Sequence, residues 1–233
     1  MTDTRLDKFV SNQTLLSRND ARKAIFTGRV KVNGETVTKI DFKIDTKNDS
    51  ITLDGEDVVF EKYVYLIMNK PKGILSATTD KNAKTVVDLL PDIYKKRNIF
   101  PAGRLDKDST GMLLLTDDGE FAHKITGPKH HIEKAYIVEL DGEITDDVIK
   151  GFKDGVTLYD GEECVSAVCE KIGNTTARVI LTEGKYHQIK RMFGVYDLGV
   201  NELHRERIGA LTLPNELKEG QFCKIDPQIL TKN

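Results

Sequence analysis

The sequence has no long hydrophobic run, and no stretch approaches the roughly twenty apolar residues that a membrane-spanning helix needs. Its N-terminus, MTDTRLDKF, also lacks the apolar segment of a secretory signal peptide. These two absences predict a soluble protein that stays in the cytoplasm and has no membrane partner.

Cysteine is scarce, and the three that occur, Cys164, Cys169 and Cys223, do not have the C-x-x-C spacing typical of zinc or redox sites. We therefore expect reduced thiols with a structural role. The sequence also lacks a P-loop, a dinucleotide-binding fingerprint and an array of metal ligands. The His130-His131 pair has no further ligand close to it in the sequence, so we expect neither a metal nor a cofactor.

Positive charge is not in excess overall, because the formal net charge is −2. This balance excludes a uniformly basic nucleic-acid-binding protein. The positive charge is concentrated locally: residues 1–34 hold seven Lys or Arg against three acids, a net charge of +4, whereas acids gather between Glu139 and Glu163. Contact with nucleic acid is therefore expected near the N-terminus.

The first 60 residues predict a small α/β module. Apolar residues within 6–10 have helical spacing, and Ser17 is placed to cap a second helix that Gly28 ends. The turn pairs at 33–34 (Asn-Gly) and 54–55 (Asp-Gly) then indicate short hairpins. A compact unit of two helices and hairpins over residues 1–60 is the result.

The pattern changes from Tyr63 onward. Longer strand-like runs, YVYLIMNK, MLLLTDD, AYIVEL and ARVILTEG, are separated by short helical or turn-rich pieces. This mixture predicts an α+β domain over residues 61–233, built on a mainly antiparallel mixed sheet that is flanked by helices and loops.

Basic residues of the N-terminal module are candidates for RNA contacts. Arg18 and Arg22 share one face of the second helix and begin a basic ridge suited to phosphates, although a solvated helix face is the plain alternative. The candidates are Arg5, Lys8, Arg18, Arg22, Lys23, Arg29 and Lys31. The strings RLDKF, SRNDARKAI and GRVKVNGE occur in order and resemble the S4 RNA-binding domain, which implies RNA binding without naming a reaction.

Three further segments form a set that indicates chemistry. In PAGRLDKDSTGMLLLTDDGEF, a loop presents Asp106 before an apolar run, although Asp106 or Asp108 can instead cap a turn. The segment EKAYIVEL places Tyr136 on a strand, where the alternative is a core tyrosine. The segment LTEGKYHQIKRMF gathers a basic stretch that contains Lys185, His187, Gln188, Lys190 and Arg191.

Almost the whole chain resembles the pseudouridine synthases, and more narrowly the RsuA family that acts on small-subunit ribosomal RNA. GRLDKDSTGMLLLTDDG is the most specific piece, and NKPKGILSATTD and LHRERIGALTL also match. The resemblance implies that Asp106 is the catalytic aspartate and Tyr136 the active-site tyrosine. It also implies that Lys190 is the basic partner of the aspartate, although the neighbouring Arg191 can take that part.

The resemblance further implies a monomer that isomerises one uridine of 16S ribosomal RNA in an assembling small subunit, at the uridine 516 site. Additional RNA contacts are expected from Arg104, Lys185, His187, Gln188 and Arg191, and from Lys129, His130, His131 and Lys134. Arg104 can instead pair with a nearby acid.

The isomerisation breaks the bond from ribose to N1, turns the trapped uracil and joins the same sugar carbon to C5. Nothing is oxidised, reduced or hydrolysed, so no cofactor is required. Three alternatives remain: a synthase that acts on 23S ribosomal RNA, a non-catalytic RNA-binding or ribosome-assembly factor, and a hydrolase that uses Asp106 with His187 or His204.

Overall fold

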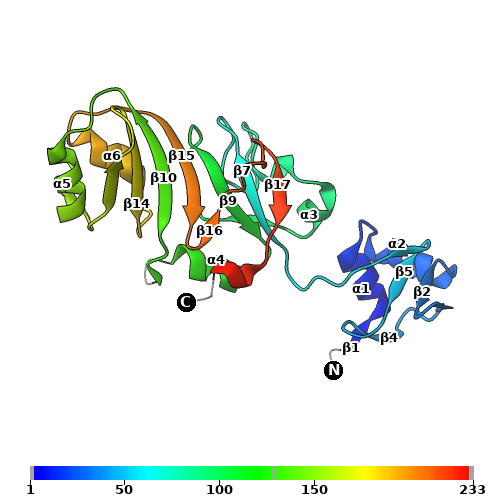
Figure 1. Ribbon diagram of the computed structural model, residues 1–233. Helices are drawn as coiled ribbons and strands as arrows, with labels where there is room; N and C mark the ends of the chain where they lie inside the picture. The colour runs from blue at the N-terminus through cyan, green and yellow to red at the C-terminus, as the bar shows by residue number, and fades with distance from the viewer. Residues whose placement is uncertain (1–2, 128–129, 231–233) are drawn as a thin grey trace. The chain divides into compact units, whose positions relative to one another are not determined.

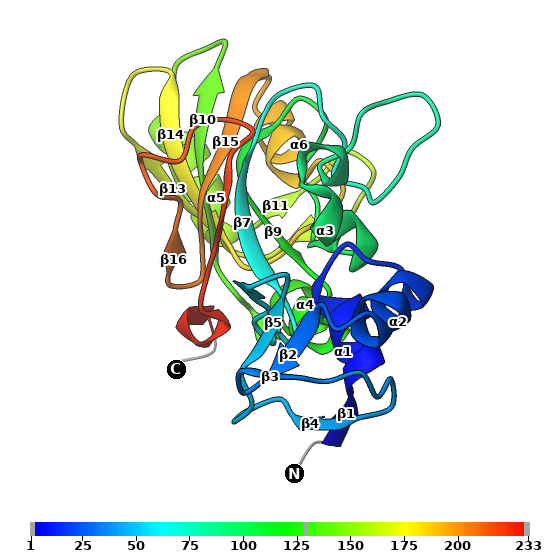
Figure 2. The ribbon, with the colours of Figure 1, turned by 90° about the vertical axis from the view of Figure 1, so that its right-hand side faces the viewer.

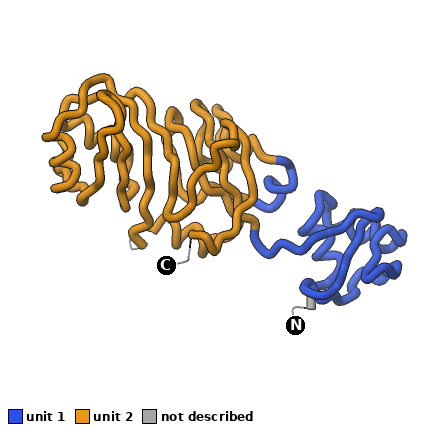
Figure 3. Tube along the Cα trace, in the orientation of Figure 1, with its two compact units in different colours: residues 1–63, 91–98 blue, residues 64–90, 99–233 orange. Residues whose placement is uncertain are grey.

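The computed structural model describes residues 3–127 and 130–230. The chain divides into two compact units (Figure 3). The first unit is Met1–Tyr63 with Pro91–Asn98, and the second is Val64–Leu90 with Ile99–Asn233. The sequence predicts a single boundary near residue 60, so the place of Pro91–Asn98 in the first unit differs from that expectation.

Helix α3 (Asp92–Lys96) is fixed in the first unit by contacts that are distant in sequence. The ammonium group of Lys96 donates hydrogen bonds to the backbone carbonyl oxygens of Ser11 (2.5 Å), Thr14 (2.8 Å) and Leu16 (2.6 Å). Carbonyls at and beyond the end of a helix lack intrahelical partners and accept such bonds readily. No local sequence pattern reveals this pairing, so the sequence alone assigns the segment to the second domain.

Besides α3, the first unit contains two helices and several short strands. Its elements in Met1–Tyr63 are β1 (Asp3–Arg5), α1 (Leu6–Gln13), α2 (Arg18–Phe26), β2 (Val30–Val32), β3 (Glu35–Thr36), β4 (Lys43–Asp45), β5 (Ile51–Leu53) and β6 (Glu56–Asp57). The strands form a four-stranded sheet in the order β3-β2-β5-β6 and a separate β1-β4 pair. Helices α1 and α2 pack side by side (Figures 1 and 2).

The predicted ends of α2 and the first hairpin are confirmed. Ser17 accepts a hydrogen bond from the backbone N–H of Asp20 at the start of α2. Gly28 follows the helix with φ of +75°, a left-handed conformation that favours glycine. Residues 33 and 34 both have positive φ, as the Asn-Gly turn of a hairpin requires.

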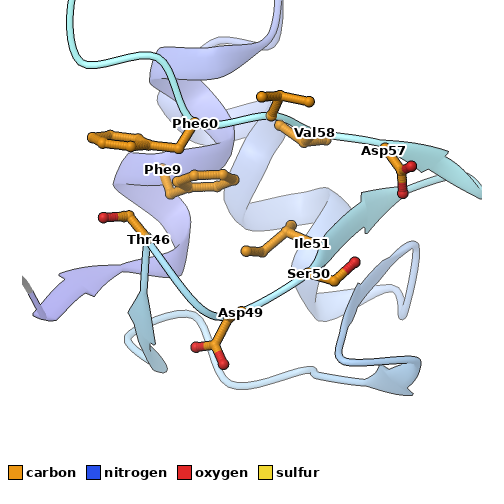
Figure 4. Close-up of a pocket in the computed structure, with 9 residues that line it drawn as sticks. Phe9, Thr46, Asp49, Ser50, Ile51, Asp57, Val58 and Phe60 are labelled. Atoms are coloured by element: carbon orange, nitrogen blue, oxygen red, sulfur yellow. The ribbon is translucent and has the colours of Figure 1, made fainter.

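The core of the first unit lies between the helices and the sheet. The ten buried residues that form it are Leu6, Phe9, Val10, Ala21, Ala24, Ile25, Val30, Val32, Ile44 and Ile51. At one side Phe60 stacks on Phe9, with ring centroids 6.2 Å apart, beside a hollow that Asp49 and Asp57 also line (Figure 4). The segment that leads out of the unit is thereby packed against α1.

The second unit is built on one large sheet. Its main path runs β13-β14-β10-β15-β9-β7-β17, with β16 paired to β15 and β8 paired to β9 (Figure 1). The strands are β7 (Tyr65–Lys70), β8 (Phe100–Ala102), β9 (Thr110–Thr116), β10 (Lys134–Leu140), β13 (Val168–Lys171), β14 (Thr176–Leu181), β15 (Val200–Ile208), β16 (Leu211–Thr212) and β17 (Phe222–Lys224). All pairings are antiparallel except β9 with β15, so the predicted mainly antiparallel mixed sheet is confirmed.

Helices cover this sheet and create two hydrophobic clusters. Helices α5 (Asp146–Asp154) and α6 (Gln188–Gly194) pack against β10 and β14, whereas α4 (Gly119–Thr126) packs against β7, β8 and β9. The remaining elements are the short pair β11 (Val156–Thr157) and β12 (Glu163–Cys164) and the 3₁₀ turns η1 (Val87–Leu89) and η3 (Pro227–Leu230).

All three cysteines are free, and burial raises the pKa of the Cys169 thiol to about 11. Within residues 3–127 and 130–230, no helix is long and apolar enough to cross a membrane.

Candidate active site

Asp106 lies in the loop between β8 and β9, and its carboxylate is 26% exposed. Strand β9 is central in the sheet, so the carboxylate stands at the end of a core strand. Immediately after the loop, Gly111 has φ of +98°, and a Cβ there would collide with the backbone oxygen of Arg205. Only glycine allows this close approach of β9 to β15.

The side chain of Lys70 anchors the loop that contains Asp106 through hydrogen bonds. Its side chain is completely buried at the end of β7, and its ammonium group donates to the carbonyl oxygens of Pro71 (3.1 Å), Lys107 (3.3 Å) and Ser109 (2.8 Å). Burial lowers the pKa of Lys70 to about 8, and the charges of Asp108 and Asp106 act in the opposite direction. Sequence reasoning did not select Lys70, although a lysine that ends a buried strand in NKPKG is an unusual signal.

The segment after Lys70 adds further contacts to the same loop. The N–H of Gly73 donates to the carbonyl oxygen of Lys107 at 2.7 Å. The hydroxyl of Ser76 donates to the carbonyl oxygen of Leu105 at 2.8 Å and accepts from its N–H at 3.0 Å. The backbone around Asp106 is therefore fixed on both sides, and the carboxylate is presented in one place.

Two side chains at the start of α6 approach Asp106. His187 Nε2 lies 3.4 Å from Asp106 Oδ1, and Lys190 Nζ lies 3.9 Å from Asp106 Oδ2. Lys190 is closer still to Asp108, at 2.6 Å, and this hydrogen bond lowers the pKa of the Asp108 carboxyl. One ammonium group is thus shared by two carboxylates.

Arg191 forms ion pairs with other acidic residues and not with Asp106. Its guanidinium pairs with Asp160 at 2.5 Å and with Glu162 at 2.8 Å. Of the two candidates for the partner of Asp106, Lys190 is the one that the structure places beside it.

Tyr136 is buried on β10, in register with Arg205 on β15. The Nη1 atom of Arg205 lies 3.5 Å from the Tyr136 hydroxyl, and its Nε donates to the carbonyl oxygen of Met112 at 2.7 Å. The other terminal nitrogen, Nη2, is buried and has no hydrogen-bond partner in the described part of the chain. Arg205 lies within LHRERIGALTL, but sequence reasoning assigns it no role, because its pairing crosses three strands.

Several predicted site residues line one pocket. Six predicted site residues line it: Arg104, Asp106, Tyr136, Lys185, His187 and Gln188. Ser109 is a lining residue that the sequence did not indicate, and its buried hydroxyl has no partner among residues 3–127 and 130–230. A carboxylate, an aromatic ring and unused polar groups therefore face one pocket.

Two of the residues predicted to contact RNA, Lys185 and Gln188, have partners within the protein. Lys185 pairs with Glu183 at 3.5 Å, and the Gln188 side-chain amide donates to the same carboxylate at 2.8 Å. Arg104 is exposed and forms no ion pair with a described residue, so pairing with a nearby acid is not observed. His187 has φ of +47° at the N-terminal end of α6, and its ring stacks on Tyr186 with centroids 3.9 Å apart.

Of the two histidines considered for a hydrolase, only His187 is near Asp106. His204 instead shares a hydrogen bond of 2.9 Å with Thr110, and burial lowers its pKa. His130 is exposed, whereas Lys129 lies outside the described residues. No group of three His, Cys, Asp or Glu side chains within the described ranges is arranged to hold a metal ion.

The basic residues of the first unit that are predicted to contact RNA fall into two sets. Arg29 pairs with Asp54 through hydrogen bonds of 2.8 and 2.5 Å, and Arg5, Arg18 and Arg22 converge on Asp7. Lys8, Lys23 and Lys31 are exposed and make no ion pair with a described residue.

Comparison with known proteins decides the family. A family model described as RNA pseudouridylate synthase matches residues 64–194, and the S4 domain model matches residues 4–51. The chain belongs to the RNA pseudouridylate synthase family.

Relatives of this synthase match along nearly their full length. It is 40% identical to the ribosomal small subunit pseudouridine synthase A of Escherichia coli (strain K12), over 94% of both chains. It is 39% identical to a protein of Aquifex aeolicus described as an uncharacterized RNA pseudouridine synthase, over 95% of this chain and 92% of that one. A crystal structure of a pseudouridylate synthase has a TM-score of 0.70 at 34% identity and covers 98% of each chain. The protein is thus an RNA pseudouridine synthase with an N-terminal S4 domain.

Proposed function

We propose that this synthase converts one uridine of small-subunit ribosomal RNA into pseudouridine, at the uridine 516 site, with Asp106 as the catalytic residue. The target is supported by the relative in Escherichia coli, whose name specifies the small ribosomal subunit. The single observation that carries the catalytic assignment is the position of Asp106, which lines a pocket together with Tyr136 while Lys190 and His187 approach its two oxygens.

Asp106 would act in its charged form. As a carboxylate it either adds covalently to the substrate or removes a proton from the ribose, and both routes need a free oxygen lone pair. A nearby cation stabilises a carboxylate through charge attraction. Lys190 at 3.9 Å supplies that charge without a tight ion pair, because its short contact is with Asp108. Asp106 therefore keeps an oxygen available for the substrate.

Tyr136 would hold the extruded uracil. A flat ring at the pocket wall offers a stacking surface for a base that has left the RNA helix. In the final step the C5 proton leaves and N1 gains a proton, so the overall reaction is an isomerisation. The Tyr136 hydroxyl lies 3.5 Å from the Arg205 guanidinium, which fixes its direction and supports a part in that proton transfer.

The S4 domain would capture the RNA through phosphates. Its basic residues are Arg5, Lys8, Arg18, Arg22, Lys23, Arg29 and Lys31. In the second unit, Arg104, Lys185, His187, Gln188 and Arg191 would add contacts near the target nucleotide. We propose a monomer that acts on 16S RNA in an assembling small subunit, in the cytoplasm.

The test is to incubate the full-length protein, without added cofactor, with unmodified 16S ribosomal RNA and with partly assembled small subunits, and to map pseudouridine chemically. One new site at uridine 516 is expected, and Asp106→Asn should remove it while RNA binding is retained. A new site in 23S RNA would contradict the target, and turnover by the Asn variant at the wild-type rate would contradict the role of Asp106. Absence of any new site would favour a non-catalytic assembly factor.

A further inference from the structure

One carboxylate in the S4 domain organises three arginines. Asp7, in the first turn of α1, has a completely buried side chain. The three arginines around it, called here the arginine cluster, are Arg5 (Nε to Oδ1, 3.1 Å), Arg18 (Nε to Oδ2, 3.5 Å) and Arg22 (Nε to Oδ2, 3.0 Å). One arginine would be enough to neutralise the buried carboxylate of Asp7. With three arginines around it, the cluster together with Asp7 has a net charge of +2.

The outer ends of the cluster are available to a ligand. The side chains of Arg5, Arg18 and Arg22 are 44%, 49% and 43% exposed. Arg18 and Arg22 each use only Nε toward Asp7, and their terminal nitrogens have no hydrogen-bond partner among the described residues. Terminal guanidinium nitrogens form the fork that binds phosphate oxygens in pairs.

The carboxylate at the centre stays charged. Burial raises the pKa of Asp7, but the hydrogen bonds from Arg5 and Arg22 outweigh burial and bring the pKa to about 2. Long arginine side chains otherwise lose conformational freedom when they bind. Asp7 holds the arginines through Nε in the free protein. Much of their conformational freedom is therefore already lost before RNA binds.

We propose that Asp7 is a positioning residue that keeps the arginine cluster preformed for the phosphates of the RNA backbone. The inference rests on the proposed capture of RNA by the S4 domain. Asp7 would thereby strengthen RNA binding although it is acidic. From its charge alone, an acidic residue at this surface would be expected to weaken RNA binding.

The two accounts predict opposite results for Asp7→Asn. If charge alone matters, removal of a negative charge from a phosphate-binding surface tightens RNA binding. If Asp7 positions the cluster, the variant loses affinity by about tenfold, because freed arginines must be ordered at each binding event. Asp57→Asn is the matched control: Asp57 is an exposed acid of the same domain and makes no ion pair with a described residue.

The experiment measures affinity of the full-length protein for a labelled transcript of unmodified small-subunit ribosomal RNA at fixed salt. Asp7→Asn is made in the wild type and in the Arg18→Gln, Arg22→Gln double variant. We expect the loss of about tenfold in the wild type, little further loss in the double variant, and less than about twofold change for Asp57→Asn.

Equal or tighter binding by Asp7→Asn would overturn the proposal. A similar loss in the double variant would also overturn it, because a variant that merely fails to fold loses binding in both backgrounds. The assay does not depend on modification of the RNA. If no pseudouridine forms but the expected pattern of affinities is seen, the proposed function fails and the role of Asp7 stands.

Discussion

Lys190 and Arg191 are neighbours in the sequence, but their side chains contact different acids. Lys190 lies 3.9 Å from Asp106, whereas Arg191 binds Asp160 and Glu162. Lys190→Met should therefore lower kcat by about 100-fold, the usual scale for removal of one charge that supports a reacting group. Arg191→Met should change kcat by less than about threefold, although it removes the same charge.

Single-turnover rates at saturating RNA measure this difference, and circular dichroism checks the fold of both variants. Equal losses in the two variants, or a greater loss for Arg191→Met, would show that the basic partner of Asp106 has been assigned to the wrong side chain.

Arg205 is expected to act through Tyr136. Its guanidinium joins the Tyr136 hydroxyl to the carbonyl of Met112 on strand β9. Arg205→Lys keeps the positive charge but lacks the planar guanidinium that reaches both groups at once, so we expect kcat to fall by about tenfold. In a double-mutant cycle with Tyr136→Phe, the second substitution should add little, with a coupling of about 1 kcal/mol. Additive losses would mean that Arg205 does not work through the hydroxyl.

The resemblance to a known family indicated Asp106, Tyr136 and Lys190 as candidate site residues, and it left Arg191 open as the alternative to Lys190. The reason is geometric: the two are adjacent on α6 and point to different partners only once the helix is placed on the sheet. Lys70 and Arg205 were not predicted because their roles depend on carbonyl groups from distant parts of the chain.

At the scale of elements, the end of β7 controls the loop that carries Asp106. Lys70→Met removes the hydrogen bonds to the carbonyl oxygens of Pro71, Lys107 and Ser109, and of these contacts the one to Ser109 is buried. A shift of the loop by about 1 Å would reduce kcat by about 100-fold with RNA affinity unchanged. Lys72→Met is the control, because Lys72 is 52% exposed and pairs with Glu202 at the surface. The prediction fails if Lys70→Met alters affinity and leaves kcat intact.

The start of α1 should make the S4 domain sensitive to acid. The folded-state pKa of Asp7, about 2, lies below the usual value near 4, so its contribution is present above pH 4 and is lost as pH falls toward 2. That contribution is on the order of 2 kcal/mol. Thermal unfolding followed between pH 5 and pH 2 should show the difference between wild type and Asp7→Asn shrinking. A constant difference would contradict the link to titration of this carboxyl.

Local signals predicted the S4 domain well, because Ser17, Gly28 and the Asn-Gly turn act within a few residues of where they lie. Helix α3 was not predicted to join that domain. Its attachment depends on Lys96 meeting three carbonyls about eighty residues earlier in the chain, and a periodic pattern holds no information on such a pairing.

For the whole molecule, we propose that the first unit captures RNA and the second carries out the reaction, and this division can be tested without truncation. Deletion of residues 1–60 would also remove the carbonyl partners of Lys96 and disturb α3. Lys8, Lys23 and Lys31 are better targets, because they are exposed and make no ion pair with a described residue. Their triple replacement by Gln should raise KM by about tenfold and leave kcat unchanged, since phosphate contacts determine capture and not the chemical step.

The salt dependence makes this prediction quantitative. Removing one lysine that binds a phosphate of single-stranded RNA lowers the slope of log affinity against log salt by about 0.7, so removing three lowers it by about 2. The matched control replaces Lys150, Lys153 and Lys218, exposed lysines of the second unit, with Gln and removes the same total charge. If the control variant changes KM and the salt slope equally, capture depends on net charge, and the division between an RNA-binding unit and a catalytic unit is wrong.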